Sequence, residues 1–308
     1  MSEAPPIVVT GSHRSGTTWV GRIMALSRGT GYIHEPLNPS RRPGWGAGRV
    51  PYWYLYVCSE NAARWRPVFD DAFSFRYRVG PNLRDASSPR GAAWLIQDLR
   101  HAVPGRIRRA RAVLKDPFAL FSTEWLSETY DARIVITVRN PIAFVGSIKK
   151  LNWRFKFRTV LQQDLLMRDH LGGLAGEMRR CRDGDVDVVE EGIVLWNMIH
   201  TTVDRLRREH PEWAIVRHED LAADPSRGFR DLYRSVGLAW DEGTERRLAR
   251  FTSGSKGEVP VWQHMTVRRS SAATAAAGLN RLSEAEVERV RAGTTETARS
   301  FGYFLETE

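Results

Sequence analysis

Short runs of aliphatic and β-branched residues alternate along the chain with stretches in which apolar residues recur at helical spacing. Four runs have the composition of buried strands: Ile7–Thr10, Ala112–Leu114, Ile134–Val138 and Trp213–Val216. Six stretches have the pattern of helices: one from near Thr17, Phe118–Tyr130, one from Pro141, Glu190–His210, Pro225–Val236 and Ser283–Arg291. This alternation predicts an α/β fold with a mainly parallel central sheet flanked by helices.

Neither an internal repeat nor a long linker interrupts the chain, so its 308 residues predict a single domain over 1–308. Two segments lack a clear period. The segment 38–90 is rich in proline, glycine and aromatic residues, and we expect irregular structure that covers an active site. The segment 253–278 has the composition of a loop.

The charge balance adds a preference for anionic partners. The formal net charge is +10, which favours nucleic acid, an acidic lipid surface or a multiply phosphorylated ligand. The arginines are scattered, with local clusters at Arg106–Arg111 and Arg205–Arg208. Each cluster is either a binding patch or a solvated basic surface. Because no nucleic-acid recognition motif accompanies them, we expect no nucleic-acid partner.

Cysteine content and hydropathy bear on the compartment. Cys58 and Cys181 are too few for a disulfide framework and wrongly spaced for zinc. No run approaches the ~18 apolar residues of a membrane span, and residues 1–6 lack the pattern of a signal peptide. We therefore expect a cytoplasmic protein without a membrane span.

The first predicted strand runs into a glycine-containing turn and then a helix. Backbone N–H groups in such a turn, together with the helix dipole, favour an anion. Gly11 and Gly16 permit the backbone twist. Arg14 adds a permanent charge, and Thr17 and Thr18 add hydroxyl donors. The turn therefore predicts a phosphate-binding site.

The turn nearly matches the phosphate loop of nucleoside triphosphatases, but one residue differs. In those enzymes a lysine reaches the β- and γ-phosphates, and here Thr17 stands in its place. This argues against a triphosphate in the usual pose, although a P-loop kinase or ATPase stays an alternative.

A second anion site is expected at the end of the strand Ile134–Val138. Arg139 follows this strand directly, at the edge of a parallel sheet where ligands bind. Ser147 lies eight residues later, about two turns into the next helix. A guanidinium and a hydroxyl so placed are suited to a second phosphate.

The two sites together resemble the family of sulfotransferases that use 3′-phosphoadenosine 5′-phosphosulfate (PAPS). In that family a Ser-Gly-Thr-Thr loop holds the 5′-phosphosulfate, and an Arg followed eight residues later by a Ser holds the 3′-phosphate. The corresponding residues here are Ser15-Gly16-Thr17-Thr18, then Arg139 and Ser147. The resemblance implies the P-loop-like sulfotransferase fold. It also implies that Trp19 stacks on the adenine, although a core position is an equal alternative.

One branch of this family is more similar than the others. An arginine in the first loop, a Glu-Pro shortly afterwards and the sequence Lys-Asp-Pro-Phe resemble the tyrosylprotein sulfotransferases and related bacterial enzymes. Here these are Arg14, Glu35-Pro36 and Lys115–Phe118. The resemblance implies that Glu35 is the general base, and that Arg14 and Lys115 stabilise charge on the leaving phosphate. The alternatives are a solvated turn residue for Glu35, and for Lys115 an ion pair with Asp116 or another carboxylate.

Two positions depart from the family pattern. The family often has tyrosine before Glu-Asp-Leu, near the adenine, whereas this chain has His218 there. His218 is a candidate contact with the nucleotide or an ordinary histidine. The C-terminal cofactor loop, expected at about 253–278, is not clearly recognisable. Its candidates are Arg268, Ser270 and Ser271, and the alternative is a mobile basic loop.

These expectations amount to a PAPS-dependent sulfotransferase that acts on a hydroxyl-bearing acceptor and needs no metal. The acceptor could be a glycan, a glycolipid, a phenolic metabolite or a tyrosine. A basic nucleic-acid-binding protein is the non-enzymatic alternative.

Overall fold

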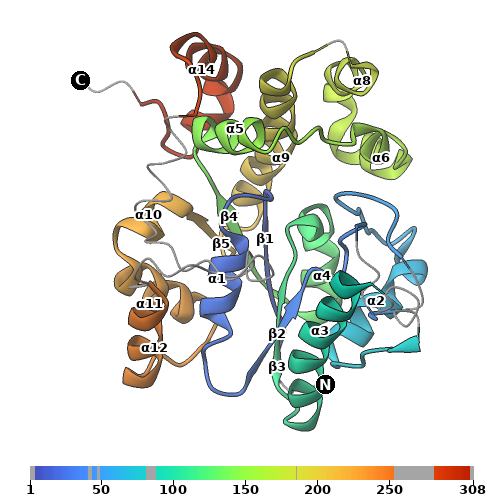
Figure 1. Ribbon diagram of the computed structural model, residues 1–308, viewed down its shortest axis with the longest axis vertical. Coiled ribbons are helices and arrows are strands. Elements are labelled where there is room, and N and C mark those ends of the chain that lie inside the picture. The colour runs from blue at the N-terminus through green and yellow to red at the C-terminus, as the bar shows by residue number, and fades with distance from the viewer. Residues whose placement is uncertain are drawn as a thin grey trace. The chain divides into compact units, whose positions relative to one another are not determined.

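The computed structural model describes residues 4–40, 44–46, 49–80, 88–184, 186–252 and 281–305. Its strands form one five-stranded sheet in the order β2-β3-β1-β4-β5, labelled in Figure 1. Their bounds are β1 Ile7–Gly11, β2 Thr30–His34, β3 Arg111–Lys115, β4 Arg133–Val138 and β5 Ala214–Arg217. The α/β fold predicted from the sequence is confirmed.

The register of the strands sets which residues meet at the edge of the sheet. β3 pairs in parallel with both β1 and β2, with Val8 opposite Leu114 and His34 opposite Lys115. All residues of β1 and β3 are buried, as expected where helices cover both faces of a parallel sheet. The carboxyl ends of β2 and β3 are therefore level, so the residues that follow them are neighbours.

The chain divides into two compact units that alternate along the sequence. Unit 1 contains residues 1–11, 17–135 and 236–239, and unit 2 contains residues 12–16, 136–235 and 240–308. The glycine turn thus belongs to unit 2, and the helix that follows it belongs to unit 1.

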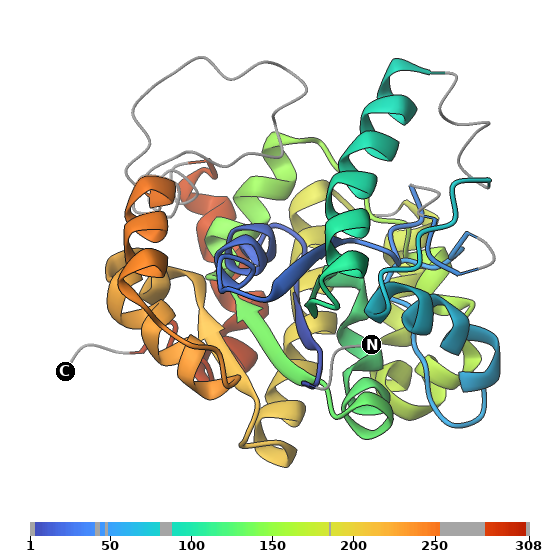
Figure 2. The same cartoon turned by 90° about the horizontal axis from the view of Figure 1, so that it is seen from below.

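Helices of unit 1 cover β1, β2 and β3. They are α1 Thr17–Met24, α2 Ala62–Phe73, α3 Pro89–Ile107, the 3-10 helix η3 Pro117–Ser122 and α4 Thr123–Tyr130. α1 packs on β1 and β3, and α3 packs on β2; Figure 2 shows α3 in teal beside the blue strands. Helix α1 approaches β3 closely, because a Cβ at Gly21 would lie 2.8 Å from the Cβ of Lys115.

Arg111 connects β3 to the last segment of unit 1. Its side chain is largely buried, with 9% exposed. The guanidinium donates hydrogen bonds to the carbonyl oxygens of Pro5, Val236 and Gly237. The short segment 236–239 therefore completes the surroundings of a strand more than a hundred positions earlier.

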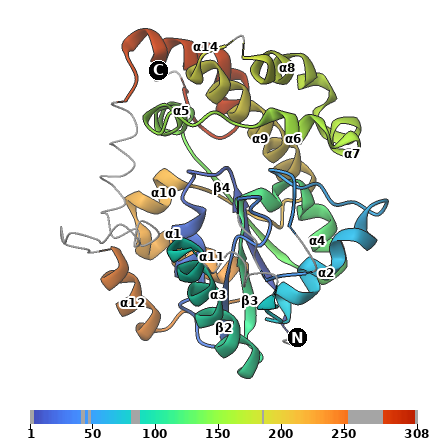
Figure 3. The ribbon, with the colours of Figure 1, turned by 45° about the vertical axis from the view of Figure 1, so that its right-hand side comes forward.

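Unit 2 is mainly helical. Its helices are α5 Pro141–Lys150, α6 Phe157–Leu161, α7 Asp164–Leu166, η4 Met167–Leu171, η5 Gly172–Leu174, α8 Ala175–Asp183, α9 Val188–Glu209, α10 His218–Ala223, α11 Pro225–Ser235, α12 Glu242–Thr252 and α14 Glu284–Arg299. Figure 3 shows α5, α9 and α14 packed together. Within the described ranges, no helix combines the length and the apolar character needed to cross a membrane.

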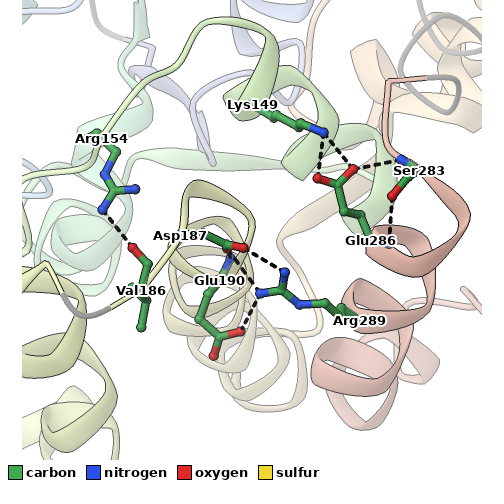
Figure 4. A network of polar contacts seen from close by, with 8 residues as sticks. All are labelled: Lys149, Arg154, Val186, Asp187, Glu190, Ser283, Glu286 and Arg289. Atoms are coloured by element: carbon green, nitrogen blue, oxygen red, sulfur yellow. Dashed lines mark hydrogen bonds and ion pairs between the residues drawn. The ribbon is translucent and has the colours of Figure 1, made fainter.

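A polar network joins these three helices (Figure 4). Lys149 of α5 donates to both carboxylate oxygens of Glu286, at 2.6 and 2.7 Å. Glu286 also accepts from the backbone of Ser283, which completes the capping box expected at the start of α14. Arg289 donates to Asp187, the N-cap of α9, at 2.7 Å. The helix starts and their packing are thus fixed by the same side chains.

Three expectations for the elements need correction. The stretch Phe118–Tyr130 is not one helix, because Asp116 caps a 3-10 helix that gives way to α4 at Thr123. The segment 38–90 is not irregular throughout, because it contains α2. Strand β2 was not predicted from the sequence, since the Thr30-Gly31 pair at its start weakens the apolar strand pattern. In the structure these two residues are only half-buried.

Candidate functional site

The turn that follows β1 has the backbone conformation of a tight loop. Gly11, Arg14 and Gly16 have φ angles of 134°, 68° and 92°. Only glycine adopts the first of these easily, and Arg14 is held in the left-handed region. The hydroxyl of Ser15 bonds to the carbonyl of Ser12 and lies 2.6 Å from the Oγ1 of Thr137 on β4. The side chain of Ser15 is therefore occupied in holding the turn.

The imidazole of His218 packs against the turn at Gly16. A Cβ at Gly16 would lie 2.5 Å from the Nδ1 of His218, so the imidazole leaves room only for glycine. Burial, together with the nearby charge of Arg139, lowers the pKa of His218 to about 4, although Glu219 opposes the shift. The ring is therefore neutral at pH 7. The structure places His218 against the turn, and its contact with a nucleotide stays a prediction.

Two arginines and a serine, far apart in the sequence, meet in unit 2. Arg14 donates from Nε to the Oγ of Ser147 at 3.0 Å, and Arg139 donates from Nη1 to the carbonyl of Arg14 at 2.6 Å. Arg139 and Ser147 are buried, with 5% and 1% exposed, and Arg14 is exposed. Burial lowers the pKa of Arg139 to about 10, so the guanidinium still carries its charge at neutral pH. Two guanidinium groups and a hydroxyl beside a glycine turn are suited to phosphate groups.

The peptide group between Arg139 and Asn140 is fixed by residues that the sequence did not single out. Trp196 donates from Nε1 to the carbonyl of Arg139 at 3.0 Å. The next N–H, that of Asn140, donates to Glu219 at 3.0 Å, and the hydroxyl of Tyr303 donates to the other oxygen of Glu219 at 2.7 Å. Glu219 stood in the Glu-Asp-Leu motif, but nothing in the sequence linked Trp196 or Tyr303 to Arg139.

Unit 1 brings together Glu35 and Lys115, which follow or end the neighbouring strands β2 and β3. The backbone N–H of Glu35 donates to the carbonyl of Lys115 at 2.8 Å, and the Lys115 ammonium donates to the Glu35 carboxylate. Glu35 has a left-handed φ of 47°, which turns the chain at the sheet edge. Lys115 is almost completely buried, and Glu35 is 15% exposed. The alternative expected for Lys115 was an ion pair with Asp116 or another carboxylate, and in the structure the partner is the carboxylate of Glu35.

Opposing effects set the protonation of Glu35. Burial raises its pKa, but the Lys115 ammonium and His34 lower it, as do hydrogen bonds from Lys115 and Asn38. The net result is a pKa well below the usual range. Asn38 donates to the second oxygen at 2.6 Å, and His34 Nε2 lies 3.9 Å from the first. In the structure, Glu35 is therefore an ionised carboxylate in an ion pair with Lys115.

Asp116 has a structural role next to this pair. It is fully buried and accepts hydrogen bonds from the N–H groups of Leu37 at 2.6 Å and Phe118 at 2.9 Å. Burial and the neighbouring charge of Glu35 raise its pKa to about 7. Asp116 therefore fixes the chain on both sides of the Glu35–Lys115 pair.

The remaining predicted residues are placed as follows. Thr17, Thr18 and Trp19 form the first turn of α1; Thr17 and Trp19 are buried and Thr18 is half-buried. Trp19 has 6% of its surface exposed. Arg268, Ser270 and Ser271 lie outside the described residues, as does the segment 253–278 that contains them.

Comparison with known proteins identifies the family to which these residues belong. The model of the Sulfotransferase family matches residues 5–242, which is more than half of the chain and includes Arg14, Glu35, Lys115, Arg139 and Ser147. The chain belongs to the sulfotransferase family. No curated protein sequence matches it.

Solved sulfotransferase structures are similar at low identity. The sulfotransferase domain of the Synechococcus PCC 7002 olefin synthase is 16% identical, with 99% of this chain and 98% of that chain covered and a TM-score of 0.48. The sulfotransferase domain from the curacin biosynthetic pathway is 11% identical, with 96% and 99% covered and a TM-score of 0.48. Sulfotransferase STF1 of Mycobacterium tuberculosis is 20% identical, with 95% and 77% covered and a TM-score of 0.41.

Proposed function

We propose that this sulfotransferase transfers the sulfuryl group of PAPS to an acceptor hydroxyl and releases 3′-phosphoadenosine 5′-phosphate (PAP). The observation that carries the proposal is the meeting of Arg14, Arg139 and Ser147 next to a glycine turn. A donor with phosphates at both the 5′ and the 3′ positions needs two anion sites, and this arrangement supplies charge for both.

Within this proposal, Arg139 and Ser147 hold the 3′-phosphate. Arg14 and the segment Ser15-Gly16-Thr17-Thr18 hold the 5′-phosphosulfate, with N–H groups at the start of α1 as further donors. The proposed contacts of Trp19 and His218 with the nucleotide, and of Arg268, Ser270 and Ser271 with its phosphates, rest on the family resemblance.

The proposed reaction is an in-line displacement at sulfur. Glu35 accepts the proton of the acceptor hydroxyl while the acceptor oxygen bonds to sulfur. The bond between sulfur and the bridging phosphate oxygen breaks, and its electron pair leaves with PAP. The family resemblance assigns Lys115 and Arg14 to the charge that develops on that oxygen. Proton, electron pair and leaving group are all assigned in this scheme, so it requires no metal.

The ion pair between Lys115 and Glu35 suggests how the base becomes available. While Lys115 bonds to Glu35, the low pKa of Glu35 makes it a weak base. If the ammonium turns to the phosphosulfate, Glu35 loses the main interaction that opposes the effect of burial, and its pKa rises. Arrival of the donor would therefore prepare the carboxylate for the acceptor.

The acceptor class follows from this chemistry only as far as a hydroxyl: a glycan, a glycolipid, a phenolic metabolite or a tyrosine. We propose that the chain acts as a single domain in the cytoplasm, without a nucleic-acid partner. Transfer from labelled PAPS to a panel of these four classes would identify the acceptor.

Binding of PAP and AMP tests the proposal directly. We expect PAP to bind at least about tenfold more tightly than AMP, because only PAP has the 3′-phosphate that Arg139 and Ser147 would hold, and one charge-assisted bond accounts for such a ratio. Isothermal titration calorimetry measures both affinities. Equal affinities would contradict the proposal, and Mg²⁺-dependent turnover of ATP would support the kinase or ATPase alternative instead.

A further inference from the structure

A pocket of about 280 Å³ lies in unit 1 between two chain segments at the ends of helices. One segment is residues 73–76 at the end of α2, and the other is residues 105–110 at the end of α3. The second segment contains most of the arginine cluster at Arg106–Arg111 that the sulfotransferase chemistry leaves without a role.

The pocket is a built feature, because one aromatic ring joins its walls. The ring of Phe75 is wedged between two glycines, and a Cβ at Gly31 of β2 or at Gly105 of α3 would come within 2.5 Å of it. Phe75 is 2% exposed. The two segments are therefore held at a fixed separation by close packing on the sheet.

Two residues that line the pocket have a left-handed backbone conformation that ends a helix. Phe75 and Arg109 have φ angles of 52° and 48°, and each lies two residues after the last residue of a helix, α2 or α3. The N–H of Arg76 donates to the carbonyl of Asp71 at 2.8 Å, and that of Ala110 donates to the carbonyl of Gly105 at 2.9 Å, as in a common helix C-terminal cap. These caps fix the backbone of the two segments that line the pocket.

The lining is positively charged. It includes Arg76, Arg106 and Arg109 and no acidic residue. Arg76 is paired with Asp71 at 3.2 Å. Within the part of the chain that the structure describes, neither Arg106 nor Arg109 has a side-chain hydrogen bond or an ion pair, and both are exposed. Two unpaired guanidinium groups at a preformed pocket match the charge of a phosphate dianion.

The pocket is separate from the proposed catalytic residues of unit 1. Ala110 lines the pocket and directly precedes β3, whereas Lys115 ends this strand. The length of the strand puts roughly 15 Å between them.

We propose that this pocket is a second anion site, which binds the phosphate group of a small phosphorylated molecule. The phosphate could belong to a free metabolite or to a lipid headgroup. A lipid would also find apolar side chains next to the arginines, because Val103 and Ile107 of α3 are 51% and 76% exposed. The inference does not depend on the proposed reaction.

Titration with inorganic pyrophosphate at constant ionic strength tests the site. The pocket variant combines Arg106→Gln with Arg109→Asn, because asparagine tolerates the left-handed backbone. The control combines Arg100→Gln with Arg108→Gln, which removes the same charge from exposed positions outside the pocket lining. Because the anion sites proposed for the donor also bind pyrophosphate, we expect two classes of binding site in the wild type and in the control. At the class that belongs to the pocket, we expect the pocket variant to bind at least about tenfold more weakly than the wild type, and the control to bind within about twofold of it.

Vesicles distinguish the two sources of phosphate. A lipid headgroup predicts sedimentation with phosphatidylglycerol vesicles but not with phosphatidylcholine vesicles, and loss of this binding in both the pocket variant and Ile107→Ser. A free metabolite predicts the pyrophosphate result alone, unchanged in Ile107→Ser. Either outcome supports the site. If the pocket variant and the control behave alike toward both probes, any binding is due to diffuse charge and the proposal is wrong.

Discussion

Lys115 and Glu35 show how one contact between two residues limits a reaction. The ammonium keeps the carboxylate ionised and lowers its pKa, so Glu35 needs Lys115 to move before it can take a proton efficiently. In the free protein, the same ion pair compensates the charge of the buried Lys115. A buried lysine without a partner would destabilise the fold. The pair is therefore both a structural element of the sheet edge and part of the proposed chemistry.

Replacement of Glu35 by glutamine tests its role as the base. Glutamine keeps the shape and an acceptor for Asn38 but takes no proton at neutral pH. We expect Glu35→Gln to bind PAP as the wild type does and to turn over about 10²–10⁴-fold more slowly, because the loss falls on the chemical step. Single-turnover sulfation with saturating PAPS measures the rate.

The exposed Glu128 of α4 provides the control, and Glu128→Gln should react at the wild-type rate. If Glu35→Gln is also as fast as the wild type, Glu35 is a turn residue. His34, whose Nε2 lies 3.9 Å from the Glu35 carboxylate, would then be the nearest replacement.

Replacement of Arg139 by alanine tests the proposed 3′-phosphate site. We expect Arg139→Ala to weaken PAP binding about tenfold or more and to leave AMP binding nearly unchanged, because AMP lacks the group that Arg139 would hold. Calorimetry with both nucleotides gives the comparison. Arg133→Ala removes an exposed arginine from the start of the same strand and should affect neither. Equal losses for PAP and AMP in Arg139→Ala would assign Arg139 a structural role.

Single residues of the site were predictable where their type and spacing carry chemistry. The glycine turn, Arg139 and Ser147 eight residues later, and Lys115 after a buried strand could all be read from the sequence. Trp196, Glu219 and Tyr303 could not be linked to Arg139, because Trp196 and Glu219 bond to the peptide group between Arg139 and Asn140, and Tyr303 bonds to Glu219. Such contacts depend on how distant helices pack, which local patterns do not encode.

At the scale of elements, the strands were predicted better than the connections between them. Continuous buried runs mark β1, β3 and β4, whereas β2 starts with Thr30-Gly31 and is half-buried there. Helix α2 was hidden by Pro67 in its interior, since proline usually ends a helical pattern. Tertiary packing overrides the local signal in both cases.

Helix α9 contains a titratable group that should control acid stability. His200 is completely buried and stacks on Trp196 at 4.0 Å, and burial lowers its pKa to about 3 from 6.5. Between these values the unfolded chain binds more protons, so stability falls as the pH falls. Between pH 6 and 4, we expect the free energy of unfolding of His200→Gln to fall by about 1.4 kcal/mol less per pH unit than that of the wild type. Urea denaturation at several pH values measures it.

Thr201→Ser, at an exposed position of the same helix, changes no titratable side chain and serves as the control. We expect its stability to follow the pH as the wild type does. Parallel pH profiles for wild type and His200→Gln would show that His200 does not titrate in this range.

For the whole molecule, binding of PAP should stabilise the fold by mass action. At about one hundred times its dissociation constant, PAP adds about 2.7 kcal/mol to the free energy of unfolding, which raises Tm by roughly 5 °C in a chain of this size. We expect scanning calorimetry to show one transition that PAP shifts and adenosine does not. Two transitions, of which PAP shifts only one, would contradict the proposal of a single cooperative domain.

The contacts of Arg111 have a consequence for synthesis of the chain. This guanidinium on β3 bonds to the carbonyls of Val236 and Gly237, so unit 1 is not complete until the ribosome has added about 125 further residues after Arg111. Such distant pairing carries a high loop-closure cost and slows folding. A nascent chain that ends before Val236 should therefore stay sensitive to protease around β3, and should become resistant once the segment 236–239 has emerged.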